Sequence, residues 1–268
     1  MKKAIIIGAT SGIGQEVAGI LSEMKKFVLP NDYPDMPSSL MHIYLIEAGP
    51  RLLAGMSEES SAHAEQFLRE MGVNILLNKR VVDYRDHKVV LEDGTEIATR
   101  TFIWVSGVTG VTIGNLDASL IGRGGRIKVD SFNRVEGMNN VFAIGDQCIQ
   151  VADEDYPNGH PQLAQVAIQQ GELLAKNLVR MEKGREMKPF HYRNLGSMAT
   201  VGRNRAVAEF SKVKMQGWFA WVMWLVVHLR SILGVRNKVI VLLNWVWNYF
   251  TYDQSMRMIV YALSLIHI

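Results

Sequence analysis

Three glycines, Gly8, Gly12 and Gly14, are spaced in a way that indicates a chemical task. They close a short apolar run at residues 4–8 and open a segment with the apolar periodicity of a helix. A bound pyrophosphate needs a turn free of side chains and unpaired N–H groups at a helix N-terminus, where the helix dipole favours anions. The pattern therefore predicts a dinucleotide site, and the alternative is a purely structural turn.

A carboxylate, Glu47, follows the second apolar run of the chain, at residues 42–46. A carboxylate at the end of this strand can accept both hydroxyls of a ribose and would repel a 2′-phosphate, which favours NADH over NADPH. The interval from Gly14 is 33 residues, longer than the usual ~20, and an insertion at residues 27–41 accounts for the difference. The alternative is a solvated acid at a strand end.

The elements that must position these residues follow in an alternating order. Further strands are predicted at residues 73–77 and 101–105, a helix is predicted at 57–71, and three short strands with period-two patterning lie between residues 80 and 98. Strand, helix, strand, helix, strand, meander and strand describe an α/β fold: a parallel sheet with a β-meander insert, in a Rossmann-type domain.

A second unit begins near residue 110. Strands are predicted at residues 126–129 and 141–144, and a long helix at 161–181. Residues 191–211 are polar, with glycines at two positions, and an aromatic tail follows.

The tail differs from the body in both aromatic content and charge. Five of the six tryptophans lie between residues 218 and 247, and residues 211–268 carry six lysines and arginines against one acid. The basic balance therefore comes from the tail and favours an anionic lipid surface, with no nucleic acid as a partner.

Two apolar runs in the tail, at 218–229 and 239–250, are shorter than the ~18 to 20 residues that span a bilayer. We expect amphipathic helices that lie in the membrane plane, so that the protein is peripheral. The single cysteine suits a reducing compartment, which favours the cytoplasmic face of the cell membrane. A homodimer interface or a core helix is the alternative, and the two interpretations are compatible. The single cysteine, Cys148, excludes an intramolecular disulfide and is interpreted as a small core residue, and we expect no metal site.

Five stretches carry a resemblance to a known family. They are residues 19–26 (GILSEMKK), 45–53 (LIEAGPRLL), 102–108 (FIWVSGV), 141–146 (VFAIGD) and 164–171 (AQVAIQQG). Over about nine tenths of its length the chain resembles type II NADH dehydrogenases, the non-proton-pumping NADH:quinone oxidoreductases of the FAD-dependent pyridine nucleotide-disulfide oxidoreductase superfamily. The resemblance implies hydride transfer from NADH to FAD, and electron transfer to a membrane quinone.

The resemblance also implies domains and residue roles. The implied domains are an NADH-binding domain at 1–110, the C-terminal part of an FAD-binding domain at 111–190, and a membrane-binding module at 191–268. The residues implied beside the nicotinamide are Ser106, Gly107 and Val108. Those implied to hold the ribityl and phosphate portion of FAD are Gly145 and Asp146. The implied catalytic residues are Glu16, near nicotinamide and flavin, with Gln165 and Gln169, whose spacing of four puts them on one helix face.

The chain departs from the family at its ends. The family has an FAD-binding strand and glycine turn more than a hundred residues upstream of its NADH-binding unit, so we expect an N-terminally truncated form. Residues 1–18 carry a glycine turn that resembles short-chain dehydrogenases, and residues 261–268 do not continue the family pattern.

Two alternatives remain open from the sequence. A short-chain dehydrogenase would use a tyrosine and a lysine four residues apart on a helix, and Tyr84 and Lys88 have that spacing but lie in the predicted meander. The other alternative is a membrane-associated NADH-binding fragment without activity, which would retain no flavin.

Overall fold

The computed structural model describes residues 2–8, 12–32, 34–35, 37–111, 113–211, 213–232 and 234–251, with only the backbone given for residues 2–7 and 32. The departure expected at residues 261–268 lies outside the described residues, as do residues 9–11 of the glycine turn. The chain divides into two compact units, one made of residues 1–105 with 197–268 and the other of residues 106–196. Each unit is described by itself.

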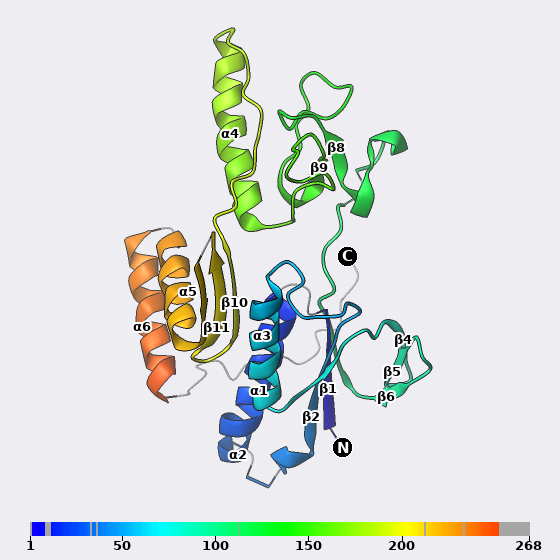
Figure 1. The fold of residues 1–268 in the computed structure, drawn as a ribbon, viewed down its shortest axis with the longest axis vertical. Coiled ribbons are helices and arrows are strands. Elements are labelled where there is room, and N and C mark those ends of the chain that lie inside the picture. Colours follow the sequence, from blue (N-terminus) through cyan, green and yellow to red (C-terminus); the bar gives the residue numbers. More distant parts are fainter. Residues whose placement is uncertain are drawn as a thin grey trace, which may run out of the picture. The chain divides into compact units, whose positions relative to one another are not determined.

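A parallel sheet of four strands forms the centre of the first unit (Figure 1). Its strand order is β3-β2-β1-β7, and the strands are β1 (Lys2–Ile7), β2 (Met41–Ile46), β3 (Val73–Leu76) and β7 (Thr101–Trp104). β1 pairs with β2 on one side and with β7 on the other, both in parallel register. The parallel sheet of a Rossmann-type domain, predicted from the sequence, is therefore confirmed.

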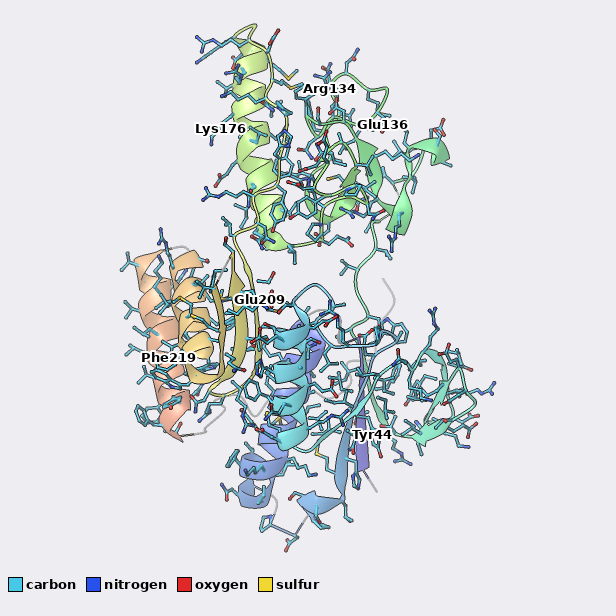
Figure 2. All side chains as sticks on the ribbon, viewed as in Figure 1. Tyr44, Arg134, Glu136, Lys176, Glu209 and Phe219 are labelled. Atoms are coloured by element: carbon cyan, nitrogen blue, oxygen red, sulfur yellow. The ribbon has the colours of Figure 1, made fainter. Side chains whose placement is uncertain are left out.

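Two helices cover one face of this sheet. They are α1 (Gly12–Glu23) and α3 (Glu58–Glu70), and their buried side chains share one core with β2 and β3. Ser57 caps α3 by accepting a hydrogen bond from Ser60 N, and two glutamates occupy the first turn. Glu209, labelled in Figure 2, ties this cap to a distant strand, since its carboxylate accepts hydrogen bonds from the Ser57 N–H (3.0 Å) and hydroxyl (2.5 Å).

The predicted meander covers the other face. Its strands are β4 (Val81–Arg85), β5 (Lys88–Leu91) and β6 (Glu96–Ala98), paired antiparallel. Val89, Leu91 and Ile97 pack against Ile46 of the central sheet. A turn at Asp93 and Gly94 joins β5 to β6, with Gly94 at a φ of 82°.

An antiparallel sheet lies against α1 and α3 on the side away from the central sheet. It consists of β10 (Ser197–Gly202), β11 (Arg205–Phe210) and β12 (Val213–Gln216). One of its faces contributes Ala199, Val201 and Val207 to the core of α1 and α3. The opposite face packs against α5 (Gly217–Ser231), and α6 (Val235–Thr251) packs against α5 (Figure 1). Among the described residues, no helix is long and apolar enough to cross a membrane.

The second unit is built on a short parallel pair, β8 (Ile127–Val129) and β9 (Cys148–Gln150), and one long helix, α4 (Ala164–Glu182). Ile127, Val129 and Cys148 form one small core. Val166 of α4 forms another with Phe190 and Tyr192 of the returning chain.

Two elements differ from those expected. Residues 141–144, predicted as a strand, form only an isolated antiparallel bridge between Arg134 and Phe142. Their apolar pattern is that of a strand, but a ladder needs a partner along its length, and the described residues provide one only at this bridge. Residues within the expected insertion at 27–41 are partly helical, because α1 continues through a π-helical turn, Met24–Val28, into α2 (Leu29–Asp32).

Candidate functional site

The glycine turn joins β1 to α1 at a point where the two elements nearly touch. Gly8 follows β1 with a φ of 99°, and a Cβ added to Gly14 would stand 1.9 Å from the Gly8 carbonyl oxygen. Gly14 is therefore required for the close approach of the helix. A Cβ on Gly12 would meet Ala199 Cβ at 3.6 Å, an ordinary contact, so the packing of the chain does not itself demand glycine there.

The carboxyl ends of β1, β2 and β7 lie side by side at the edge where Gly8 and Glu47 are found. β7 and β2 flank β1, so the strand order changes direction at β1, and ligands of such sheets bind outside the carboxyl ends at this point. Glu47 is 6% exposed, and its Oε1 accepts a hydrogen bond from Gly49 N at 2.9 Å. The structure thus brings the predicted glycine turn and the predicted ribose acid to one edge.

An apolar cavity of about 620 Å³ lies elsewhere in the same unit, between α1, β10, α5 and α6. Four of the six tryptophans line it: Trp218, Trp221, Trp224 and Trp245. Its polar lining side chains include Glu16, Glu23, Thr200 and Arg203. Glu16, predicted as catalytic, is thus a wall residue of an amphipathic cavity, whereas the other three were not predicted from the sequence.

Arg203 organises the polar end of this cavity. Its backbone N–H donates to Glu23 Oε1 at 2.5 Å. Its guanidinium donates to the carbonyl oxygens of Tyr249 and Asn248, both at 3.0 Å. These carbonyls belong to the last turn of α6, where a helix has no internal donors left. Arg203 therefore caps α6 and engages Glu23, which leaves Glu16 as the other carboxylate of the lining.

In the second unit, Gly145 and Asp146 lie in a 3-10 turn before β9, and Gly145 has a φ of 66°. The Asp146 side chain is exposed, but the Gly145 N–H already donates to Gln170 Oε1 at 2.7 Å. Gln170 is almost completely buried. Sequence reasoning missed it, because only the fold shows that it points to the turn.

Burial raises the pKa of the Cys148 thiol, and nearby Arg126 only partly offsets this. Arg126 Nε also donates to the Cys148 carbonyl at 2.6 Å, so a basic side chain lies beside this residue. Because the raised pKa keeps the thiol protonated, Cys148 serves as a core residue and not as a nucleophile.

Gln165 and Gln169 do share one face of α4, as their spacing predicts. Gln165 Nε2 donates to Gly196 O (3.1 Å) while its Oε1 accepts from Leu195 N (3.2 Å). Gln169 makes the same pair of bonds with the carbonyl and N–H of Arg193, at 2.9 and 3.1 Å. Both amides therefore bind the backbone of residues 193–196, through which the chain leaves the second unit. Their catalytic roles stay predictions.

Ser106, Gly107 and Val108, predicted beside the nicotinamide, are exposed and begin the second unit directly after β7. Gly107 has a φ of 102°. The described structure gives them no partner that tests their role.

The tyrosine and lysine of the short-chain dehydrogenase alternative lie on neighbouring strands. In the pairing of β4 with β5, Tyr84 lies opposite Val89, and Lys88 lies opposite Arg85. Lys88 instead pairs with Glu96 at 2.7 Å, and this hydrogen bond raises the pKa of Lys88. The helical arrangement that this alternative needs is therefore not formed.

The fold and the sheet edge are those of a dinucleotide-binding class of protein, and comparison with known proteins agrees. Residues 1–171 match the profile of the pyridine nucleotide-disulphide oxidoreductase family, so the chain belongs to that family. Residues 194–252 match the NDH2 C-terminal domain. The resemblance to type II NADH dehydrogenases, predicted from the sequence, is confirmed.

Two named relatives agree with this family assignment. The chain is 34% identical over 254 residues to a type II NADH:quinone oxidoreductase, NdhA, of Mycobacterium tuberculosis, covering 90% of this chain and 52% of the relative. It is 30% identical over 259 residues to an internal alternative NAD(P)H-ubiquinone oxidoreductase of Arabidopsis thaliana, covering 90% and 49%. The chain thus spans about half the length of the curated relatives it matches.

Among solved structures, NDH2 from Plasmodium falciparum in complex with NADH has a similar fold. The TM-score is 0.83 at 18% identity, and the match covers 94% of this chain and 66% of that one. The α/β fold class expected from the sequence is confirmed.

Proposed function

We propose that this chain provides the NADH-binding and quinone-binding parts of a flavin-dependent NADH:quinone oxidoreductase. NADH binds at the edge formed by Gly8, Gly14 and Glu47, and the quinone enters the tryptophan-lined cavity. The names of the relatives, which are NADH:quinone and NAD(P)H-ubiquinone oxidoreductases, support this assignment.

One helix carries the proposal, because α1 takes part in both sites. Its first turn contains Gly14, which meets the end of β1, and Glu16, Ile20 and Glu23 of the same helix line the cavity. Glu16 follows Gly14 by two positions, a rise of about 3 Å along the helix. A pyridine nucleotide at the turn and an apolar acceptor in the cavity would therefore share one rigid element.

The second unit fits part of an FAD. Asp146 offers an exposed carboxylate at a glycine turn, a suitable acceptor for ribityl hydroxyls. The Gly145 N–H is engaged by Gln170, so the proposed contact to the flavin rests on Asp146. Gln165 and Gln169 hold residues 193–196 and so fix where the chain leaves this unit.

Flavin, when bound, supplies the two-electron chemistry that links NADH to the quinone. NADH gives up a hydride, and the quinone takes two electrons and two protons to become a quinol, so one proton comes from the medium. Glu16 places a carboxylate in the cavity wall, and we assign it the passage of that proton to a quinone oxygen.

We also propose that α5 and α6 rest on an anionic lipid surface, which places the protein peripherally on the cytoplasmic face of the cell membrane. None of the 17 residues of α6 is buried, although most are apolar. Phe219 of α5, labelled in Figure 2, is 73% exposed, and Phe250 of α6 is 78% exposed. Arg230 and Arg236 lie near the turn between the two helices, where they can meet anionic headgroups.

Flavin retention tests the oxidoreductase assignment. The purified chain is incubated with FAD, desalted, and its visible spectrum is recorded before and after anaerobic addition of NADH. We expect a retained flavin band that NADH bleaches. A colourless chain would contradict the assignment of flavin chemistry to this chain and would favour an NADH-binding, membrane-associated fragment.

A further inference from the structure

Thr200 carries a buried hydroxyl that finds no hydrogen-bond partner among the described residues. The residue is 6% exposed and lies in β10. Its neighbours Ala199 and Val201 point into the core of α1 and α3, so the alternation of a strand turns Thr200 to the opposite face, towards α5. Buried polar groups are nearly always paired, because an unpaired one loses its hydration without compensation.

Thr200 lies in the wall of the tryptophan-lined cavity. The other polar groups nearby are largely engaged. Glu23 accepts the Arg203 N–H, and the Arg203 guanidinium caps α6. The Thr200 hydroxyl is thus an unengaged neutral donor at the polar end of a largely apolar cavity.

The packing of β10 against α1 fixes the backbone that carries this hydroxyl. A Cβ added to Gly19 of α1 would stand 2.3 Å from Val201 O, so helix and strand approach as closely as backbones can. Thr200 precedes that contact by one residue and cannot shift without moving α1.

The charges of the lining select the kind of ligand. Glu16 and Glu23 outnumber Arg203, so an anionic head such as a fatty acid carboxylate is disfavoured. A neutral ring with a carbonyl acceptor and an apolar substituent matches the Thr200 hydroxyl and the four indoles of the lining.

We propose that the Thr200 hydroxyl donates a hydrogen bond to a carbonyl oxygen of a quinone ring bound in this cavity, and so positions the ring. The inference rests on the proposed quinone function and adds the residue that orients the substrate. Thr200 is then a binding residue. Without bound quinone its buried hydroxyl lacks a hydrogen-bond partner, which lowers the stability of the unliganded protein.

Quenching of tryptophan fluorescence by a decyl-substituted benzoquinone measures the binding directly in the full chain, without flavin. N-acetyltryptophanamide titrated in parallel corrects for collisional quenching and absorbance. We expect saturable quenching in the wild-type chain, a Kd about two- to tenfold higher in Thr200→Val, and a Kd near wild type in Thr200→Ser, which keeps the hydroxyl.

Thermal unfolding separates a binding role from a structural one. Removing an unpaired buried hydroxyl should leave the Tm of Thr200→Val unchanged or higher. The matched control is Thr99→Val, whose buried hydroxyl donates to Thr101 O; we expect it to lower the Tm and leave quinone binding alone.

Each outcome has one meaning. An equal Kd in wild type and Thr200→Val, or a fall in Tm for Thr200→Val like that of the control, would overturn the role of Thr200 while leaving quinone binding intact. A wild-type chain without saturable quenching would overturn both this role and the quinone part of the proposed function.

Discussion

At Gly14 the carbonyl oxygen of Gly8 occupies the space in which a side chain would begin, 1.9 Å from an added Cβ. We predict that Gly14→Ala lowers the free energy of unfolding by about 3 kcal/mol, because neither backbone can move away. Thermal unfolding followed by circular dichroism measures this. Gly12→Ala is the control, since its Cβ would make only an ordinary contact, and an equal loss in both variants would contradict the steric argument.

Glu47 permits a prediction about cofactor choice. Glu47→Gln keeps an acceptor for Gly49 N but removes the charge. We predict that the Kd for NADH rises about tenfold or more, because hydrogen bonds to charged groups contribute about 1.5–3 kcal/mol. The Kd for NADPH should rise less, since the repulsion of its 2′-phosphate is relieved.

Titration calorimetry with both nucleotides measures the two Kd values. Glu92→Gln, on the exposed meander, is the matched control. An unchanged ratio of the NADPH and NADH Kd values in Glu47→Gln would show that Glu47 does not contact the ribose.

Sequence spacing could place the residues of the sheet edge, since Gly8, Gly14 and Glu47 each follow a recognisable strand. It also placed Gln165 and Gln169 on one face, but it could not show that both amides bind backbone from residues 193–196. Thr200 and Arg203 escaped notice because their importance arises from packing against α5 and α6, far along the chain.

At the scale of elements, the antiparallel sheet of β10, β11 and β12 is marked in the sequence only by a polar stretch with glycines. Half of its buried positions are alanines, Ala199, Ala206 and Ala208, and alanine carries little of the strand signal that larger side chains give. Residues 141–144 are the opposite case, because their sequence has the pattern of a strand. They form only an isolated bridge, since the partner segment pairs with them at one position.

α6 depends on few contacts, which makes its cap testable. We predict that Arg203→Met lowers the free energy of unfolding of α6 locally by about 1–3 kcal/mol, because two carbonyls of its last turn lose their donors. Hydrogen exchange of the α6 amides should quicken. Arg205→Met is the control, since the Arg205 guanidinium forms a half-exposed pair with Glu70 at 3.4 Å and lies over the Phe67 ring at 5.9 Å, and neither partner belongs to α6. Unchanged exchange in Arg203→Met would refute the cap.

For the whole molecule, the tail accounts for most of the tryptophans and for the excess of positive charge. The structure turns that composition into two stacked helices, with a cavity between them and the body. An apolar helix without a buried residue needs a cover, and both a lipid surface and a second copy would provide one.

Vesicle binding distinguishes a lipid surface from a second copy of the chain as the partner of α6. We predict that the chain co-sediments with vesicles containing phosphatidylglycerol and that salt weakens this. Arg236→Gln with Lys238→Gln should weaken binding about ten- to thirtyfold, because each cation near an anionic surface contributes about 1 kcal/mol. Lys176→Gln with Lys183→Gln, on and just after α4 in the second unit (Figure 2), is the matched control and should bind like wild type. If the chain does not bind the vesicles and sediments as a dimer, a second copy of the chain covers α6 instead of lipid.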